Sequence, residues 1–558
     1  MLSSSPSKIT DLAIPGASLR PADLAAPAKL RNTRVSLWDV VTNRGAVVGS
    51  LALVGSFVRR VKTASGATAV QIVHKRGRIV DGIDHIGSAH DADQLALLEE
   101  LARERLHAGQ QVLEFDTRAA GRVDAGTAVV EATSARLLWQ ALDSVYEALG
   151  FTVIRDEAFR ALVMARIVEP TSKLDTVRVL GELGMGSPSR VTFMRCLKRS
   201  VARDYRELIS QACFRHATRT TRLRLALYDV TTLYFETPRE DTLRKVGMSK
   251  ERRVDPQVTV GLLTDSTGFP LAVHLFEGNK AETKTLIPVL TGFCDAHPGA
   301  AEIIVVADAG MLSAANLLAL EEAGFRFIVG SKISKAPYDL ADHLERHGNA
   351  FDDGQIIETT RTMGTGKAAR SRRVVYQWRF ARYRHDIQAI NAMIDRAEAV
   401  AAGKRPLKKD RFVKLTDTDP VVDWDLVERA RYTAGLKGYV TNIARDVLDG
   451  VQVIAAYHDL YQVERSFRMA KSDLAARPVF HRLRDSIEAH LTIVFAALAV
   501  GRLVEDRTGW SIRKFVQTAR RYRTVQIRAG AQLLTAADSI PDDLRDALAH
   551  ISGPEDAH

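Results

Sequence analysis

The sequence predicts a mixed α/β protein, and three observations support this class. Apolar side chains alternate with a period of two, as in strands, between residues 222 and 277. A continuous apolar run then ends at Asp308, and segments with helical periodicity lie before and after it. Upstream, residues 134–217 have helical periodicity throughout. We therefore expect a mainly helical region, followed by a core in which strands and helices alternate.

The chain of 558 residues is longer than one hydrophobic core usually organises, so we expect more than one domain. The order of the sequence patterns divides the chain into seven segments. We expect a flexible leader (1–56), a small β-meander with one helix (57–130), a helical region (131–220), the first part of the core (221–333), a β-rich insertion (334–437), the second part of the core (438–530) and a C-terminal tail (531–558). The helical region is basic and is therefore a candidate for a DNA-binding region whose recognition helix enters a major groove, although solvated basic faces explain the pattern as well. The residues concerned are Arg190, Arg195, Lys198, Arg199 and Arg203.

Composition and charge indicate a folded, soluble protein with a polyanionic partner. Hydrophobic residues make up 46% of the chain and charged residues 26%, so extensive disorder is not expected. The net charge of +11 favours nucleic acid as the partner, but a basic chain can equally carry a solvated surface. Local clustering within the insertion shifts the balance toward nucleic acid. The clustered residues are Arg361, Lys367, Arg370, Arg372, Arg373, Arg379, Arg382 and Arg384, followed by Lys404, Arg405, Lys408, Lys409, Arg411 and Lys414.

The cysteines and the early apolar segment indicate in which cellular compartment the protein is expected. Cys196, Cys213 and Cys294 are widely spaced and form no zinc-binding or CxxC pattern, so we expect buried thiols in a reducing cytosol. The most apolar early segment, residues 46–58, is too short to cross a bilayer. No membrane association is expected.

Two acidic residues follow predicted core strands. In RLRLALYDV, Asp229 has the parity of the inward-facing leucines, and an unpaired carboxylate there costs several kcal/mol, so it requires a cation or hydrogen-bond donors. PQVTVGLLT and FPLAVHLFEG complete a three-stranded meander, and a helix follows at about residues 280–294, capped by Asn279 with Glu282 three residues later. EIIVVADAG is a buried strand that ends at Asp308.

A third acid lies on a long helix expected at residues 450–475, after the insertion and the short strand GLKGYVTNI. This acid is Glu464. Three carboxylates at roughly 5 Å would repel one another by roughly 3 kcal/mol per pair at an effective dielectric of about 20, so the cluster requires cations. Oxygen ligands suit Mg²⁺ or Mn²⁺, and two such ions can activate the nucleophile and stabilise the leaving oxygen in phosphodiester cleavage. Asp229, Asp308 and Glu464 are thus the expected catalytic residues and metal ligands, in the order that an RNase H-like site requires.

The same residues resemble the DDE insertion-sequence transposases that carry a Tyr-Arg-Glu-Lys signature. In YHDLYQVERSFRMAK, the spacing Y-x2-R-x3-E-x6-K places Tyr457, Glu464 and Lys471 in register, but Leu460 stands where the family has Arg. Arg465 or Arg468 is expected to supply the missing phosphate contact. Further matches are YDVTTLYFE, VVADAGMLSAANL and RPVFHRLRDSIEAHLTIVFAALAV, and the resemblance extends over residues 57–523.

The resemblance implies an RNase H-like core with a β-rich insertion, and a transposase that cleaves element ends and transfers strands. It further implies two Mg²⁺ ions, for which Mn²⁺ can substitute, and double-stranded DNA as the partner, both element ends and target. A homodimer on paired ends and a bacterial-type, cytoplasmic, nucleoid-associated location also follow from it. Tyr457 and Lys471 would hold phosphates near the cleaved end.

Two other functions remain open on the sequence. An RNase H-like nuclease or resolvase would use the same acids but stop at hydrolysis. A catalytically inactive DNA-binding protein, derived from a transposase, would bind DNA without metal. A phosphatase with an aspartate nucleophile is suggested by DVTT but lacks the second Asp two residues later.

Overall fold

A computed structural model describes residues 54–63, 66–76, 79–106, 129–219, 223–248, 254–300, 302–311, 313–406, 410–416, 419–529 and 532–552. The chain divides into two compact units, Met1–Val112 and Leu113–His558. The expected leader, residues 1–56, lies almost entirely outside the described residues.

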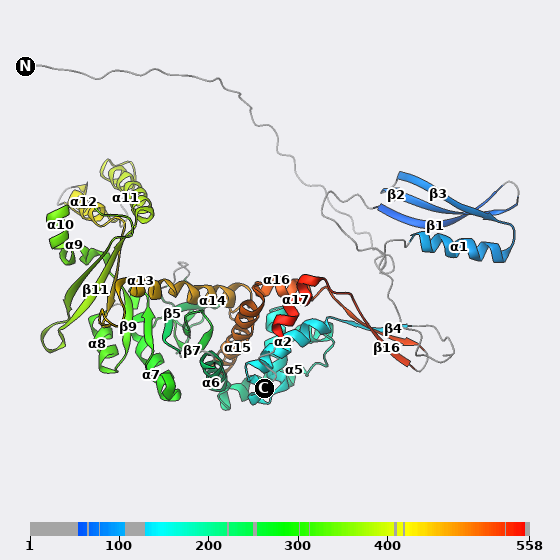
Figure 1. Ribbon diagram of the computed structural model, residues 1–558, viewed down its shortest axis with the longest axis horizontal. Helices are drawn as coiled ribbons and strands as arrows, with labels where there is room; N and C mark the ends of the chain where they lie inside the picture. Colours follow the sequence, from blue (N-terminus) through cyan, green and yellow to red (C-terminus); the bar gives the residue numbers. More distant parts are fainter. Residues whose placement is uncertain are drawn as a thin grey trace, which may run out of the picture. The chain divides into compact units, whose positions relative to one another are not determined.

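The first unit is a three-stranded antiparallel sheet with one helix (Figure 1). Its strands are β1 (Val54–Lys62), β2 (Thr68–Arg76) and β3 (Ile79–Ala89), and its helix is α1 (Ala92–Leu106). Val70, Ile72 and Ala102 form a small buried core between sheet and helix. The strands expected from the alternating pattern and the helix expected from apolar periodicity are both present.

The helical region forms as the apolar periodicity predicts, with one further division. It comprises α2 (Arg136–Ala148), α3 (Glu157–Val168), α4 (Thr176–Glu182), α5 (Arg190–Ala202) and α6 (Tyr205–Thr218). Asp204 ends the pattern that predicts a single helix over α5 and α6, because it adopts positive φ and its side chain accepts from the backbone N–H of Glu207. Side chains on this region's inner faces join the main hydrophobic core.

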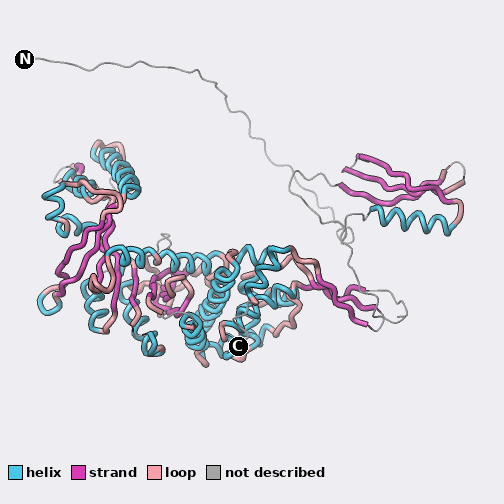
Figure 2. Tube along the Cα trace, in the orientation of Figure 1, coloured by secondary structure: helices cyan, strands magenta, loops and turns pink. Residues whose placement is uncertain are grey.

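The central element of the second unit is an eight-stranded sheet with the order β10-β11-β14-β9-β8-β5-β6-β7. Its core strands β5 (Leu225–Tyr234), β6 (Gln257–Thr264), β7 (Pro270–Glu277), β8 (Ile304–Ala307) and β9 (Arg326–Ser331) match the predicted strands. β8 pairs in parallel with β5 and β9, whereas β5, β6 and β7 form the predicted antiparallel meander. The helix α7 (Leu286–Ala296) starts six residues later than expected, because Glu282 belongs to a separate short 3-10 turn and caps nothing. Figures 1 and 2 show the alternation of strands and helices along this unit.

The insertion between β9 and β14 (Leu436–Thr441) is not β-rich, which corrects the prediction. Its longest element is the helix α11 (Phe380–Ala401), and α9 (Ala336–Asp339), α10 (Ala341–His347) and α12 (Trp424–Tyr432) add further turns. Only β10 (Ile356–Met363) and β11 (Arg370–Trp378) are long strands, and they extend the central sheet rather than forming one of their own. The short strands β12 (Val413–Leu415) and β13 (Pro420–Val422) pair with each other. α11 packs through Ile390, Ile394 and Ala397 on a separate apolar cluster with Phe412 and Val427.

The long helix expected over residues 450–475 is two helices, α13 (Gly450–His458) and α14 (Leu460–Ser472), that meet at Asp459. α13 begins with a capping box in which Asp449 and Gln452 satisfy each other's backbone N–H groups. α13 and α14 lie on one side of the sheet, and α7 and α8 (Ala314–Glu322) on the other (Figure 1). Tyr457 and Glu464 are therefore carried by successive helices on the same side of the sheet.

The helix α15 (Arg484–Thr508) packs between the helical region and the sheet of the second unit. By length and composition it could cross a bilayer, but 94% of its most apolar window is buried, and it contacts α2, α3, α5, α6 and β7. Its apolar composition is explained by this central position in the core.

The expected C-terminal tail, residues 531–558, contains a strand and a helix in its described part, residues 532–552, which is a second correction. β15 (Thr524–Ala529) pairs with both β16 (Gln532–Ala537) and β4 (Val129–Ser134), which joins the two ends of the unit. The helix α17 (Asp542–Ile551) buries Leu544, Ala547 and Ile551 and contacts α15 and α2.

Candidate catalytic site

Two of the predicted acids lie on adjacent parallel strands. Asp308 follows β8 as expected, whereas Asp229 lies within β5, which continues to Tyr234, so the expected strand end at Asp229 is wrong. Tyr228 on β5 pairs with Ala307 on β8, and the next residue along the chain is Asp229 in the first case and Asp308 in the second. Neighbouring strands lie about 4.8 Å apart, so the two carboxylates start from neighbouring backbone positions at the same edge of the pairing. Asp229 is half-buried and Asp308 is exposed. The sheet thus brings together two residues that are far apart in the sequence.

Glu464 reaches the same side of the sheet from α14. This helix contacts β5 and β6, and its Ser466 hydroxyl donates to the Gly268 carbonyl at 2.6 Å. Val463 and Phe467 are buried beneath the helix, whereas Glu464 is exposed and forms no ion pair within the described ranges. The apolar periodicity of α14 therefore fixes which side of the helix carries the carboxylate.

Tyr457 is bonded to the second aspartate. Its hydroxyl donates to Asp308 Oδ1 at 2.9 Å, and its ring is 5% exposed. Burial first, and then the negative charges of Asp308 and Asp229, hold the pKa of Tyr457 well above its usual range. The tyrosine therefore stays protonated and acts as a hydrogen-bond donor that fixes the Asp308 carboxylate.

A lysine that the sequence did not single out completes this neighbourhood. Lys437 on β14 places Nζ 4.6 Å from the Tyr457 ring centroid. Burial and the nearby Arg382 lower the pKa of Lys437, while Asp308 and Glu464 act in the opposite direction. Lys437 and Arg382 also line a cavity of about 300 Å³ between the insertion and the sheet. GLKGYVTNI gave no signal beyond a short strand, because a single lysine in a strand is usually a solvated one.

Glu282 is a fourth acid near the two aspartates. A methyl group added at Gly310 would lie 2.8 Å from Glu282 Oε2, so this carboxylate lies against the backbone just after Asp308. The pKa of Tyr228 is raised by burial, to which the charges of Asp229 and Glu282 add. Sequence reasoning placed Glu282 in the first turn of a helix capped by Asn279 and so missed its position beside Gly310.

The donor set suits a divalent cation. The charges of Asp308 and Glu464 both raise the pKa of Lys437, and those of Asp308 and Asp229 both raise the pKa of Tyr457. Carboxylate oxygens are the ligands that Mg²⁺ prefers. Across the described ranges, no three His, Cys, Asp or Glu side chains lie close enough to enclose an ion. The carboxylates share one neighbourhood without converging on a single point.

The other predicted DNA-binding residues have different surroundings. Arg468 is exposed, and Lys471 is half-buried with Nζ 5.9 Å from the Phe467 ring centroid. Arg465 donates to Glu505 Oε2 at 2.8 Å and lines a cavity of about 900 Å³ with Arg502 and Asp265. Among the residues that the structure describes, Arg468 forms no ion pair, whereas Arg465 pairs with Glu505 on α15.

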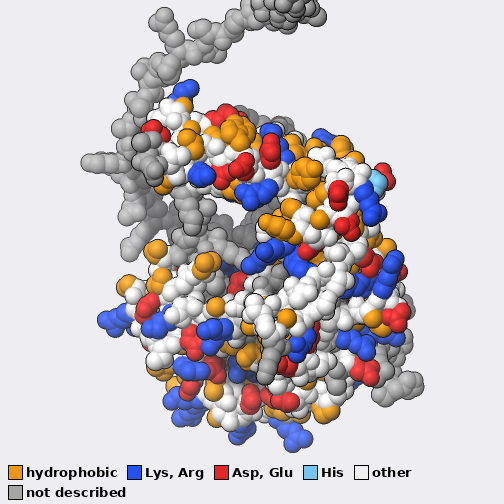
Figure 3. Space-filling model, turned by 90° about the vertical axis from the view of Figure 1, so that its left-hand side faces the viewer, with side chains coloured by type: hydrophobic (Ala, Val, Ile, Leu, Met, Phe, Trp, Pro, Cys, Tyr) orange, Lys and Arg blue, Asp and Glu red, His pale blue; other side chains and the backbone are white. Residues whose placement is uncertain are grey.

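Part of the basic cluster in the insertion serves the fold, which corrects its assignment to a nucleic-acid surface. Arg372 is 2% exposed and pairs with Glu321, and Arg361 and Arg373 pair with Asp339 and Glu358. On the face of the second unit with α10 and α11, Lys and Arg are interspersed with Asp and Glu (Figure 3). Consecutive arginines in a strand point to opposite sides, so sequence clustering alone did not reveal their partners.

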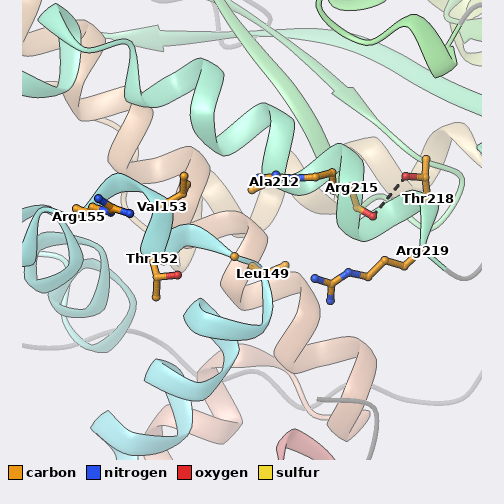
Figure 4. Close-up of a pocket in the computed structure, with 9 residues that line it drawn as sticks. Leu149, Thr152, Val153, Arg155, Ala212, Arg215, Thr218 and Arg219 are labelled. Atoms are coloured by element: carbon orange, nitrogen blue, oxygen red, sulfur yellow. Dashed lines mark hydrogen bonds between the residues drawn. The ribbon is translucent and has the colours of Figure 1, made fainter. Parts of the chain in front are cut away.

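The helical region exposes basic side chains at two places. On α5, Arg190, Arg195 and Lys198 are exposed, whereas Arg199 pairs with Asp156. A hollow of about 820 Å³ lies between the α2–α3 connection and the end of α6. Figure 4 shows Arg219 extending toward Leu149 in this hollow. Its lining residues are Leu149, Gly150, Thr152, Val153, Arg155, Ala212, Arg215, Thr218 and Arg219, three arginines and no acid.

The structure thus carries Asp229 and Asp308 on adjacent strands and Glu464 on a helix packed against the first of them. The family model described as "Transposase DDE domain" matches residues 220–500, half of the chain, and the chain belongs to this family. No curated protein matches the sequence significantly. A cryo-EM structure of a piggyBac transposase synaptic complex with hairpin DNA is 12% identical, with a TM-score of 0.35, over 65% of this chain and 69% of that one. This likeness is too low to bear on the argument.

Proposed function

We propose that this protein is an active DNA transposase that cleaves the strands at insertion-sequence ends and transfers them into target DNA. One observation carries the proposal: Asp229 and Asp308 follow residues that pair on neighbouring parallel strands, and Glu464 lies on a helix packed against the first of these strands. The alternation of three strands, helix, strand, helix and strand supports an RNase H-like core. Family membership supports a transposase over a general nuclease.

Asp229, Asp308 and Glu464 would hold two Mg²⁺ ions, with Mn²⁺ able to substitute, while substrate phosphate and water complete the coordination. The ions, when bound, would supply the activated nucleophile and the stabilisation of the leaving oxygen. Tyr457 holds the Asp308 carboxylate through its hydroxyl. Lys437 and Arg382 supply positive charge beside the carboxylates, where a DNA phosphate would arrive.

The Tyr-Arg-Glu-Lys signature enters the proposal in modified form. Tyr457 acts through Asp308 rather than on a phosphate, since its hydroxyl is already engaged. Of the two arginines near the missing position, Arg468 is the better substitute, because Arg465 is paired with Glu505. Double-stranded DNA, contacted in part by the exposed basic side of α5, and a homodimer on paired ends complete the proposal.

The test uses purified protein and a labelled duplex that carries the native element end, with Mg²⁺, Mn²⁺ or EDTA. We expect metal-dependent cleavage at the end junction and joining of the free 3′-hydroxyl to a target duplex. Asp229→Asn, Asp308→Asn and Glu464→Gln should abolish both steps and retain end binding. Cleavage without joining would indicate a nuclease, and metal-independent binding without cleavage would indicate an inactive derivative.

A further inference from the structure

Four basic side chains converge where the helical region meets the segment that follows α14. Lys173 Nζ lies 2.9 Å from His481 Nε2, and Arg166 Nη2 lies 3.4 Å from His490 Nδ1. The two imidazole rings lie 5.5 Å apart, and His490 Nε2 is 3.0 Å from the Ala476 carbonyl. Arg166 comes from α3, His490 from α15, and the other two from loops. Two helices and two loops thus build one basic cluster.

Among the described residues, the cluster has no acidic partner. Neither Arg166 nor Lys173 forms an ion pair with a carboxylate anywhere in the described ranges, and Arg166 donates only to carbonyls and to His490. Burial, with the charge of Arg166 added, lowers the pKa of Lys173 to about 7, and burial lowers that of Arg166 to about 10. Placing two partly buried cations side by side is costly unless an anion compensates them.

The surroundings of the cluster are accessible and apolar. Leu174, Phe480 and Leu483, which are neighbours of Lys173 and His481 in the chain, are exposed by 69%, 77% and 68%. An anion with an attached apolar body fits such a surface better than a small free ion does. A nucleic-acid strand has this composition, since each phosphate is joined to a sugar and a base.

We propose that Arg166, Lys173 and His481 bind a backbone phosphate of the DNA strand that the carboxylate site cleaves, while the buried His490 positions Arg166. This inference rests on the proposed function. Arg166 donates to the Leu474 and Ala475 carbonyls, ten and eleven residues beyond Glu464. Eight residues of helix separate Glu464 from the end of α14 at Ser472 and extend about 12 Å, and Leu474 lies two residues beyond that end. Phosphates of one strand are spaced by about 3.4 Å along the duplex axis. The bound phosphate therefore lies about four nucleotides from the scissile one.

The first test is Lys173→Met, with Lys173→Arg as the charge-preserving variant and Lys514→Met as the control on the exposed surface of α16 (Ile512–Ala519). End binding is measured by fluorescence anisotropy with Ca²⁺ in place of Mg²⁺. We expect about tenfold weaker binding for Lys173→Met and a salt slope smaller by about one. The melting temperature should stay level or rise, because a partly buried cation is removed. The arginine and control variants should bind like the original chain.

The second test scans single methylphosphonates, which carry no charge, along the cleaved strand. The original chain should lose most affinity from a substitution about four nucleotides from the junction, and Lys173→Met should be insensitive there. Unchanged DNA affinity with a lower melting temperature in Lys173→Met would overturn the inference and leave a structural cluster. Stabilisation by inorganic phosphate that Lys173→Met loses, with DNA binding intact, would overturn it in favour of a free anion.

The two proposals fail in different ways. An original chain that binds ends but never cleaves them would contradict the proposed function, because binding is measured without catalysis. An original chain that cleaves, beside a Lys173→Met variant with unaltered affinity and methylphosphonate profile, would contradict only the phosphate site.

Discussion

Replacing Tyr457 by phenylalanine tests how the second aspartate is held. The substitution removes the 2.9 Å hydrogen bond to Asp308 Oδ1 but keeps a ring that is 5% exposed and packed 4.9 Å from Tyr439. A hydrogen bond to a charged group contributes about 1.5–3 kcal/mol. If that contribution positions Asp308 for the reaction, single-turnover cleavage should slow by about 10- to 150-fold, since about 1.4 kcal/mol corresponds to a factor of ten.

The assay is single-turnover cleavage of a labelled end duplex over a Mg²⁺ titration, with end affinity measured in Ca²⁺. Tyr457→Phe should need more Mg²⁺ for half-maximal rate while its end affinity stays unchanged. Tyr439→Phe is the matched control, because its buried hydroxyl has no hydrogen-bond partner among the described residues. A Tyr457→Phe variant with weakened end binding and a normal single-turnover rate would refute the reasoning and restore a phosphate contact for this tyrosine.

Three further predictions concern charge. Glu321→Gln leaves Arg372 buried without its carboxylate and should lower the free energy of unfolding by about 3 kcal/mol in urea titrations; an unchanged midpoint would show that the pair is dispensable. Burial lowers the pKa values of His490 and His481, the latter to about 3, so below pH 6.5 the unfolded state takes up protons first. The melting temperature should therefore fall from pH 7 to pH 5, and it should fall less steeply in His490→Gln than in the original chain. An equally steep fall in the two proteins would show that these histidines do not cause the pH dependence. Lys437→Met should weaken end binding yet reduce the Mg²⁺ needed for half-maximal cleavage, because a cation beside two carboxylates is lost; an increased requirement would contradict this.

The core strands could be predicted because their signals are local. β6 is buried at every position and β8 at all but its first, which a continuous apolar run already indicates. Asp229 and Asp308 could be expected to meet, since acids that follow adjacent core strands share one edge of the sheet. The boundary between β6 and β7 could also be predicted from a local signal, because Asp265 and Gly268 form the turn between them.

Elements that depend on distant partners could not be predicted in the same way. β15 pairs with β4, about 390 residues earlier in the chain, so its stability is not encoded in its own alternation. Helix α17 is amphipathic, but only its contact with α15 and α2 distinguishes it from a loose tail. In the insertion, the alternation of β11 suggested a β-rich domain, whereas α11 follows it directly and packs on its own cluster.

The three acids of the candidate site are held in place to different degrees. Asp229 and Asp308 are fixed by a parallel strand pairing, and Asp308 is held further by Tyr457. Glu464 has no such constraint, since it is exposed on a helix that is separated from α13 by the break at Asp459. Arg166 donates to the Leu474 and Ala475 carbonyls, which lie just beyond the end of α14 at Ser472. A DNA strand bound at Arg166 and at the carboxylates would therefore hold α14 near Glu464 and just beyond its C-terminal end, which would couple correct seating of the substrate to completion of the site.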